Sequence, residues 1–366
     1  MKLEPFKNLL NEKAAEKIAI ALQRADNKFD KKVFLKNIKQ ELDPLELKER
    51  SYLLAEKIKQ QLPSAPNKSF PILIRALKKN EADEVGLSGF LVWPLADIVQ
   101  KYGLNDFDVS MQALYQITQV FTAEFAIRPF LISNPEKTIK QLSVWTKDKS
   151  EHVRRLVSEG SRPLLPWGQK IPQFVVDPEV TWHLLELLKF DSSKYVQKSI
   201  ANHLNDHSKN HAEWLLNKLS GWSKAPELDW IIRHATRTLV KKGHPKALAL
   251  HGIKPVKIKL LNHQIKNKTI HLGSTLNTIL EIQNLENKTI QLMIDHEIAF
   301  LKANGKHTIK VFKGKKIQIS PKQKIKLELK IPMKPVTTRK YYQGRQKWSP
   351  MINGKRFEQL NFKLTI

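Results

Sequence analysis

The 366-residue sequence contains no cysteine, which excludes disulfide bonds, thiol catalysis and cysteine-ligated zinc. It also lacks an apolar run long enough for a membrane-spanning helix. Residues 1–6 show no apolar segment of the kind found in secretory signals, so a bacterial cytoplasmic, nucleoid-associated protein is expected. Acidic residues are scarce: 35 Asp and Glu face 63 Lys and Arg, a formal charge of +28. Such a field attracts polyanions, which makes nucleic acid the leading partner class and an anionic membrane the runner-up.

The positive charge is concentrated in the last third of the chain. Residues 251–366 hold 24 Lys and Arg against 6 Asp and Glu, whereas residues 1–250 hold 39 against 29. The hydrophobic pattern changes at the same place, from helical spacing to alternation at period two. We therefore expect two domains, an α-helical domain over residues 1–252 and a basic all-β domain over residues 253–366.

The helical part contains a repeat. Short amphipathic helices are anchored by the β-branched residues Val109, Val153, Val196 and Ile232, at steps of 44, 43 and 36 residues. One pair of helices fits each period, which is the size of a HEAT-like repeat. Stacked pairs of this kind form an α-solenoid, and the concave surface of a basic solenoid suits a nucleic-acid duplex.

The last third is predicted to form a sandwich. Short segments of alternating polarity follow one another with turn signals between them. One such signal, Lys313-Gly314, separates the expected strands 306–312 and 315–319. Evenly spaced short strands are typical of an immunoglobulin-like β-sandwich.

A stretch over residues 150–167 carries the most information about function. Its carboxylates and guanidinia recur at spacings of four, four and three residues, on one face of a short helix: Glu151, Arg155, Glu159 and Arg162. One interpretation is a solvated ladder of ion pairs, each worth a few tenths of a kcal/mol. The other is a carboxylate held beside arginines and Trp167 in a nucleic-acid groove.

Several motifs, taken in order, carry a family resemblance. The stretch 153–163 with Trp167 beyond it, and the stretch 199–206, resemble the AlkC branch of the HEAT-like alkylpurine DNA glycosylases. Trp93-Pro94 and the run 124–130 look like the same branch. The resemblance covers roughly residues 1–250, and the basic β tail is similar to that of a subset of the branch.

The resemblance implies a monofunctional glycosylase that removes cationic 3-methyladenine and 3-methylcytosine during base excision repair, without flipping the base fully into a pocket. It implies that Glu124, Glu159 and Asp206 are the functional carboxylates, that Trp167 is the active-site indole, and that Arg155 supports contact with DNA. The expected partner is double-stranded DNA containing alkylated bases. No cofactor, metal, membrane or obligate protein partner is expected, and a monomer is.

These residue types suit the release of a cationic base. Methylation at N3 makes the base a cation, so the leaving group needs no general acid, unlike that of ordinary glycoside hydrolysis. One carboxylate can stabilise an oxocarbenium-like sugar, and the same or a second one can position water. An indole attracts a cationic ring by about 0.5–2 kcal/mol. We assign Glu159 to the charge and the water and Trp167 to the sugar and base, with Asp206 and Glu124 unranked in the same cleft.

Each of these residues also has a simpler interpretation. Asp206 is typical of a turn at a helix end, Glu124 of a surface acid, and Trp167 of a hydrophobic plug between repeats. Cations are predicted to bind phosphate at eight positions: Arg154, Arg155, Arg162, Lys198, Arg233, Arg237, Arg345 and Lys347. The last two lie in the aromatic stretch 341–348, whose other interpretation is a sandwich core with a charged edge.

Three histidines, His203, His207 and His211, have the spacing of ligands on a helix. However, Asn205-Asp206 is expected to interrupt that helix, so we reject a metal site. Two functions compete with the glycosylase. One is a non-catalytic HEAT-like DNA-binding protein that recognises damaged or branched DNA, and the other is a scaffold for acidic proteins.

Overall fold

The computed structural model describes residues 5–337 and 339–366. Contacts divide the chain into two compact units, Met1–His211 and Ala212–Ile366. The last helices therefore group with the strands, and the division at residue 252 stays a prediction about where the catalytic domain ends. Among the described residues, no helix combines the length and the apolar character that crossing a membrane requires.

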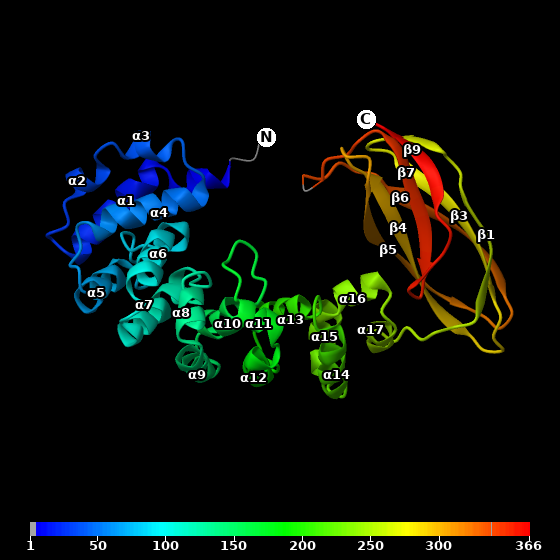
Figure 1. The fold of residues 1–366 in the computed structure, drawn as a ribbon, viewed down its shortest axis with the longest axis horizontal. Helices are drawn as coiled ribbons and strands as arrows, with labels where there is room; N and C mark the ends of the chain where they lie inside the picture. Colours follow the sequence, from blue (N-terminus) through cyan, green and yellow to red (C-terminus); the bar gives the residue numbers. More distant parts are fainter. Residues whose placement is uncertain (1–4, 338) are drawn as a thin grey trace. The chain divides into compact units, whose positions relative to one another are not determined.

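The first unit is built of α-helices joined by loops (Figure 1). Its helices are α1 (Glu12–Ala25), α2 (Lys31–Leu35), α3 (Ile38–Leu42), α4 (Leu47–Lys59), α5 (Pro66–Ala76), α6 (Trp93–Tyr102), α7 (Phe107–Val120), α8 (Arg128–Ser133), α9 (Pro135–Trp145), α10 (Glu151–Gly160), α11 (Pro172–Val176), α12 (Glu179–Leu188) and α13 (Lys194–His207). Two 3₁₀ helices, η1 (Phe6–Leu10) and η2 (Gly89–Val92), complete it.

The helix α10 is central to the later argument. It packs between α7 and α13, while α9 packs against α12. The repeat anchors Val109, Val153 and Val196 fall on α7, α10 and α13, one on each helix. Gly160 ends α10 where a β-carbon would lie 2.5 Å from the Ile127 side chain. The glycine thus lets the end of α10 approach the segment that leads into α8.

The second unit begins with the helices α14 (Ala212–Trp222), α15 (Asp229–Ala235), α16 (Arg237–Lys242) and α17 (Pro245–Leu250), with the 3₁₀ helix η3 (Pro226–Leu228). Leu216, Leu239 and Leu248 from three of these helices form a buried cluster with Met293 of the sandwich. The helices are therefore packed on the sandwich by a shared apolar core.

Two β-sheets form the sandwich, as the alternating pattern predicts. The strands are β1 (Ile258–Ile265), β2 (Thr269–His271), β3 (Thr275–Asn284), β4 (Ile290–Leu301), β5 (His307–Ile319), β6 (Lys324–Pro332), β7 (Gly344–Ile352), β8 (Lys355–Arg356) and β9 (Leu360–Thr365). One sheet has the order β1-β3-β6 and the other β2-β9-β7-β4-β5, with β8 on β7 and β2 parallel to β9. Trp348 is fully buried between them. The prediction of a helical part followed by an immunoglobulin-like sandwich is confirmed.

One local prediction is wrong. Lys313-Gly314 is not a turn, because β5 runs through it and the register of β4 on β5 shifts there. A β-carbon on Gly314 would lie 2.0 Å from the Ile294 carbonyl oxygen, so the glycine serves a close approach of two strands. The break expected near Asn205-Asp206 lies one residue further on: α13 ends at His207, and His211 lies outside it.

Candidate active site

Three carboxylates and two guanidinia alternate along one chain of ion pairs in the first unit. In order they are Glu124, Arg155, Glu159, Arg162 and Asp206. The loop between α7 and α8 supplies the first, α10 and the turn after it supply the next three, and α13 supplies the last. The structure thus brings together all three carboxylates that the resemblance singles out, over 82 positions of sequence.

Glu159 is the central member of this series of ion pairs. Its side chain is 8% exposed. Arg162 Nη1 donates to Oε1 at 2.7 Å, and the Ser199 hydroxyl donates to Oε2 at 2.6 Å. Arg155 Nη2 lies 3.5 Å from Oε1. A buried carboxylate normally carries a large desolvation cost, and these partners offset it.

Asp206 faces the other side of Arg162. Arg162 Nε donates to Oδ2 at 2.9 Å, and the half-exposed Lys209 donates to Oδ1 at 3.0 Å. Burial alone lowers the pKa of Arg162. The hydrogen bond to Asp206 and the charge of Glu159 act against burial, and the net pKa is raised. Arg162 therefore stays charged between two acids.

Glu124 lies at one end of this series of ion pairs. Arg155 and the Thr122 hydroxyl both donate to Oε2, the hydroxyl at 2.9 Å. The Arg155 guanidinium also lies over the Tyr195 ring, 5.0 Å from its centroid. Arg155, Glu159 and Arg162 are largely buried and pair with residues of other segments. They do not form the solvated ladder of ion pairs that their spacing alone allowed.

Trp167 lies on the loop that follows α10. Its side chain is 67% exposed, and its backbone has φ +64°, a left-handed conformation that is uncommon for a bulky residue. Lys48 of α4 donates to its carbonyl oxygen. An indole presented outward in this way does not act as a plug between repeats.

Arg128 fixes both ends of the same loop. The side chain is fully buried, and it donates to the carbonyl oxygens of Gly160 at 2.7 Å, Arg162 at 2.8 Å and Gln169. Burial, followed by the charge of Arg162, lowers the pKa of Arg128 to about 10. A β-carbon on Gly168 would lie 3.2 Å from Arg128 Nε, so the chain passes directly over the guanidinium.

We expect Arg128→Lys to lower the free energy of unfolding by about 2–4 kcal/mol, since one ammonium cannot reach three carbonyl groups on both sides of the loop. Urea unfolding measures this. The matched control is Arg75→Lys, because Arg75 is at the surface and donates to a single carbonyl, that of Ala25, at 3.1 Å. Equal stability losses in the two variants would contradict a fixing role for Arg128.

Known proteins resemble this chain over nearly its whole length. Residues 259–366 match the family model described as "Uncharacterised protein YhaZ, C-terminal Ig-like domain". The uncharacterized protein YhaZ of Bacillus subtilis (strain 168) is 38% identical over 98% of this chain and 99% of its own. The alkylpurine DNA glycosylase AlkC of Pseudomonas fluorescens is 34% identical, and its structure, bound to DNA containing an abasic site analog, matches with a TM-score of 0.89 over 99% of this chain and 100% of that one.

The chain belongs to the AlkC family. The resemblance read from the motifs is thereby confirmed, and it extends through the sandwich to the end of the chain.

The cations predicted to bind phosphate lie in different environments in this AlkC-family protein. Arg154 forms a two-pronged ion pair with Asp191, at 2.6 and 3.1 Å, so phosphate would compete with a carboxylate there. Arg155 and Arg162 are held by the acids described above. Lys198 is exposed on α13, next to Ser199.

In the second unit, Arg233 on α15 and Arg237 at the start of α16 line a cleft with lysines of β5. Arg233 pairs with Asp229 at 2.5 Å. On β7, Arg345 is exposed and Lys347 is half-buried. The phosphate-binding roles of these residues stay predictions.

Two of the three histidines, His203 and His207, belong to a buried network. His203 Nδ1 is 2.9 Å from the Ser158 carbonyl oxygen, and both His203 and His207 contact the Thr181 hydroxyl, at 3.2 and 3.0 Å. Burial lowers the pKa of His203 well below its ordinary value and that of His207 to about 3. These side chains are therefore neutral and connect α13 to the helices behind the site.

Sequence reasoning missed Arg128, Lys48 and a buried acid, Asp97. The Asp97 carboxylate accepts from Ser51 at 2.5 Å and from Gln100 at 2.7 Å, and Lys48 is among the charges near it. Burial raises its pKa to about 7. Nothing in the neighbouring sequence indicates that this carboxyl is buried.

Asp97 makes stability depend on pH in a defined window. The unfolded carboxyl ionises near 3.8 and the folded one near 7, so the folded state binds the extra proton between these values. Stability therefore falls as pH rises from about 4 to 7. We expect Asp97→Asn to reduce this fall, by about 2–4 kcal/mol between pH 4 and pH 8. Urea unfolding across this range measures it, and parallel curves for wild type and variant would contradict the assignment.

Proposed function

We propose that the protein is a DNA glycosylase that hydrolyses the N-glycosidic bond of cationic alkylated bases, 3-methyladenine and 3-methylcytosine, in double-stranded DNA. The observation that carries the proposal is the chain of three carboxylates held by two guanidinia, in a protein of the AlkC family. This arrangement holds negative charge in a partly dry site, where it acts on a developing positive charge more strongly than in water.

In the proposed reaction the base leaves as a neutral molecule, because its methyl group already made it a cation. The protein then has two tasks, to stabilise the oxocarbenium-like sugar and to orient a water. We assign both to Glu159. Its Oε2 accepts only the Ser199 hydroxyl among the hydrogen bonds described, which leaves a lone pair for a proton of water. Asp206 and Glu124 add negative charge and hold the arginines in place.

Trp167 is proposed to pack against the deoxyribose and the cationic base. An indole that is 67% exposed on a fixed loop offers a ring face to a duplex instead of the wall of a closed pocket. This favours excision without full extrusion of the base. The exposed Lys198 is the simplest candidate in the first unit for contact with phosphate.

A single-turnover assay of free-base release tests the proposal. Wild-type protein is mixed in excess with duplex DNA carrying one 3-methyladenine or one 3-methylcytosine, and with the unmethylated duplex as control. We expect release of the methylated base only. No release from either substrate, together with duplex binding that weakens steeply with salt, would identify a non-catalytic DNA-binding protein instead.

A further inference from the structure

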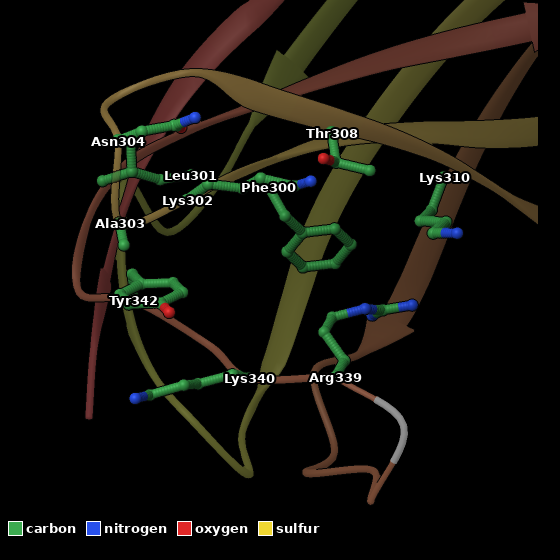
Figure 2. A pocket seen from close by; sticks show the side chains of 10 residues that line it. All are labelled: Phe300, Leu301, Lys302, Ala303, Asn304, Thr308, Lys310, Arg339, Lys340 and Tyr342. Atoms are coloured by element: carbon green, nitrogen blue, oxygen red, sulfur yellow. The ribbon is translucent and has the colours of Figure 1, made fainter.

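A basic hollow lies on the sandwich, in the second compact unit, whereas the carboxylates described above lie in the first. It has a volume of about 650 Å³ and opens between the turn that joins β4 to β5 and the segment 339–342. Figure 2 shows the Phe300 ring pointing into the hollow, with Tyr342 on one side and Arg339 on the other. This volume is within the range of small-molecule sites, roughly 300–1,000 Å³.

The charged side chains that line this pocket are all cationic. Lys302, Lys310, Arg339 and Lys340 line it, and no Asp or Glu does. Within residues 5–337 and 339–366, none of the four forms an ion pair with a carboxylate, although many other lysines and arginines of this protein do. Four neighbouring cations without a counter-charge repel one another, and an anion in the pocket would relieve that repulsion.

Arg339 is positioned before any ligand arrives. Its guanidinium carbon lies 4.3 Å from the centroid of the Phe300 ring. Its Nη1 donates to the Tyr341 hydroxyl at 3.2 Å, and that hydroxyl donates to the Lys334 carbonyl oxygen at 2.8 Å. A guanidinium held by rings keeps its remaining N–H donors free for a phosphate, which it can grip with two parallel bonds.

The aromatic lining decides which anion fits. A lone phosphate needs only cations, and so does an acidic peptide. Phe300 and Tyr342 add ring surface, and Lys340 Nζ lies 5.6 Å from the centroid of the Tyr342 ring. Rings beside cations are the combination that binds unpaired bases together with their phosphates. A paired base has both faces covered by its neighbours in the duplex and cannot use such rings.

We propose that this pocket holds one unpaired nucleotide of a DNA strand. The base lies against Tyr342 and the edge of Phe300, and the adjoining phosphate lies between Arg339 and Lys310. The site goes beyond base release at the carboxylates, because it contributes affinity for unpaired strands that no contact with a regular duplex supplies.

Binding of full-length protein to single-stranded DNA tests this proposal. The probe is a 12-nucleotide strand with 2-aminopurine at one position, and the comparison is a fully paired duplex of the same length, both at 0.15 M salt. We expect wild type to quench the 2-aminopurine fluorescence by stacking. Tyr342→Leu should lose the quenching and weaken single-strand binding about five- to tenfold, with less than a twofold effect on the duplex. Tyr342→Phe keeps the ring and should bind as wild type does.

Two double variants that lose the same charge distinguish binding in the pocket from general electrostatic attraction. Arg339→Gln with Lys310→Gln removes two cations from the pocket, and Lys324→Gln with Lys330→Gln removes two exposed cations from the opposite sheet. Only the first pair should weaken single-strand binding more than duplex binding. Equal effects of the two pairs would overturn the proposal. So would displacement of the strand by deoxythymidine monophosphate at the same nucleotide concentration, because the pocket would then serve free nucleotides.

Discussion

We expect Glu159→Gln to lower the single-turnover rate of base release by about 10²–10³-fold while duplex affinity stays within twofold of wild type. The amide keeps the size of the carboxylate, and its oxygen still accepts one hydrogen bond. It carries no negative charge for the oxocarbenium-like sugar, and it cannot take a proton from water. The two measurements are the rate of free-base release and the Kd from fluorescence anisotropy.

The matched control for this variant is Glu151→Gln. Glu151 lies at the start of the same helix, is exposed and accepts from the Ser193 hydroxyl. It should release base at the wild-type rate. If Glu159→Gln loses rate and DNA affinity in equal measure, or unfolds at a much lower urea concentration, then Glu159 is a structural residue and the catalytic assignment fails.

The second large effect concerns stability. Arg162→Met should lower the free energy of unfolding by about 3–5 kcal/mol, because it leaves two buried carboxylates without the cation between them. Arg162 is 7% exposed, and the methionine fills a similar volume without charge. Glu159 retains Arg155 and Ser199, and Asp206 retains Lys209, so part of the network survives. Urea unfolding of the first unit, followed by far-ultraviolet circular dichroism, gives the value.

Lys7→Met provides the comparison. Lys7 pairs with Glu46 at 2.8 Å in the same unit, but the two side chains are 30% and 74% exposed. Such a pair contributes at most about 1 kcal/mol. A loss for Arg162→Met no larger than that for Lys7→Met would mean that water already shields the two carboxylates.

What the sequence predicted depended on how local each signal was. Apolar spacing in α10 and alternation in the strands are local patterns, and the structure confirms the helical part and the sandwich that they predicted. Motif resemblance found the three carboxylates, although Glu124 and Asp206 lie far apart in the chain. The hydrogen bond between Lys48 and the Trp167 carbonyl oxygen joins residues 119 positions apart, and the sequence around neither residue indicates it.

The wrong prediction has a tertiary cause. Lys313-Gly314 has the composition of a turn, but it lies inside β5, and the glycine is needed there because the Ile294 carbonyl oxygen approaches it. Composition alone cannot distinguish a residue that ends an element from one that accommodates a neighbour.

The shared core of the last helices and the sandwich has a consequence for recombination between relatives. The family model begins at residue 259, yet Met293 of β4 is buried by leucines of α14, α16 and α17. A chimera joined at residue 259 would bring Met293 into contact with foreign helices or with water. A chimera joined at Ala212 carries both sides of that contact. The portable module of this protein is therefore longer than its β-strands, and exchanges that preserve it should survive where shorter ones aggregate.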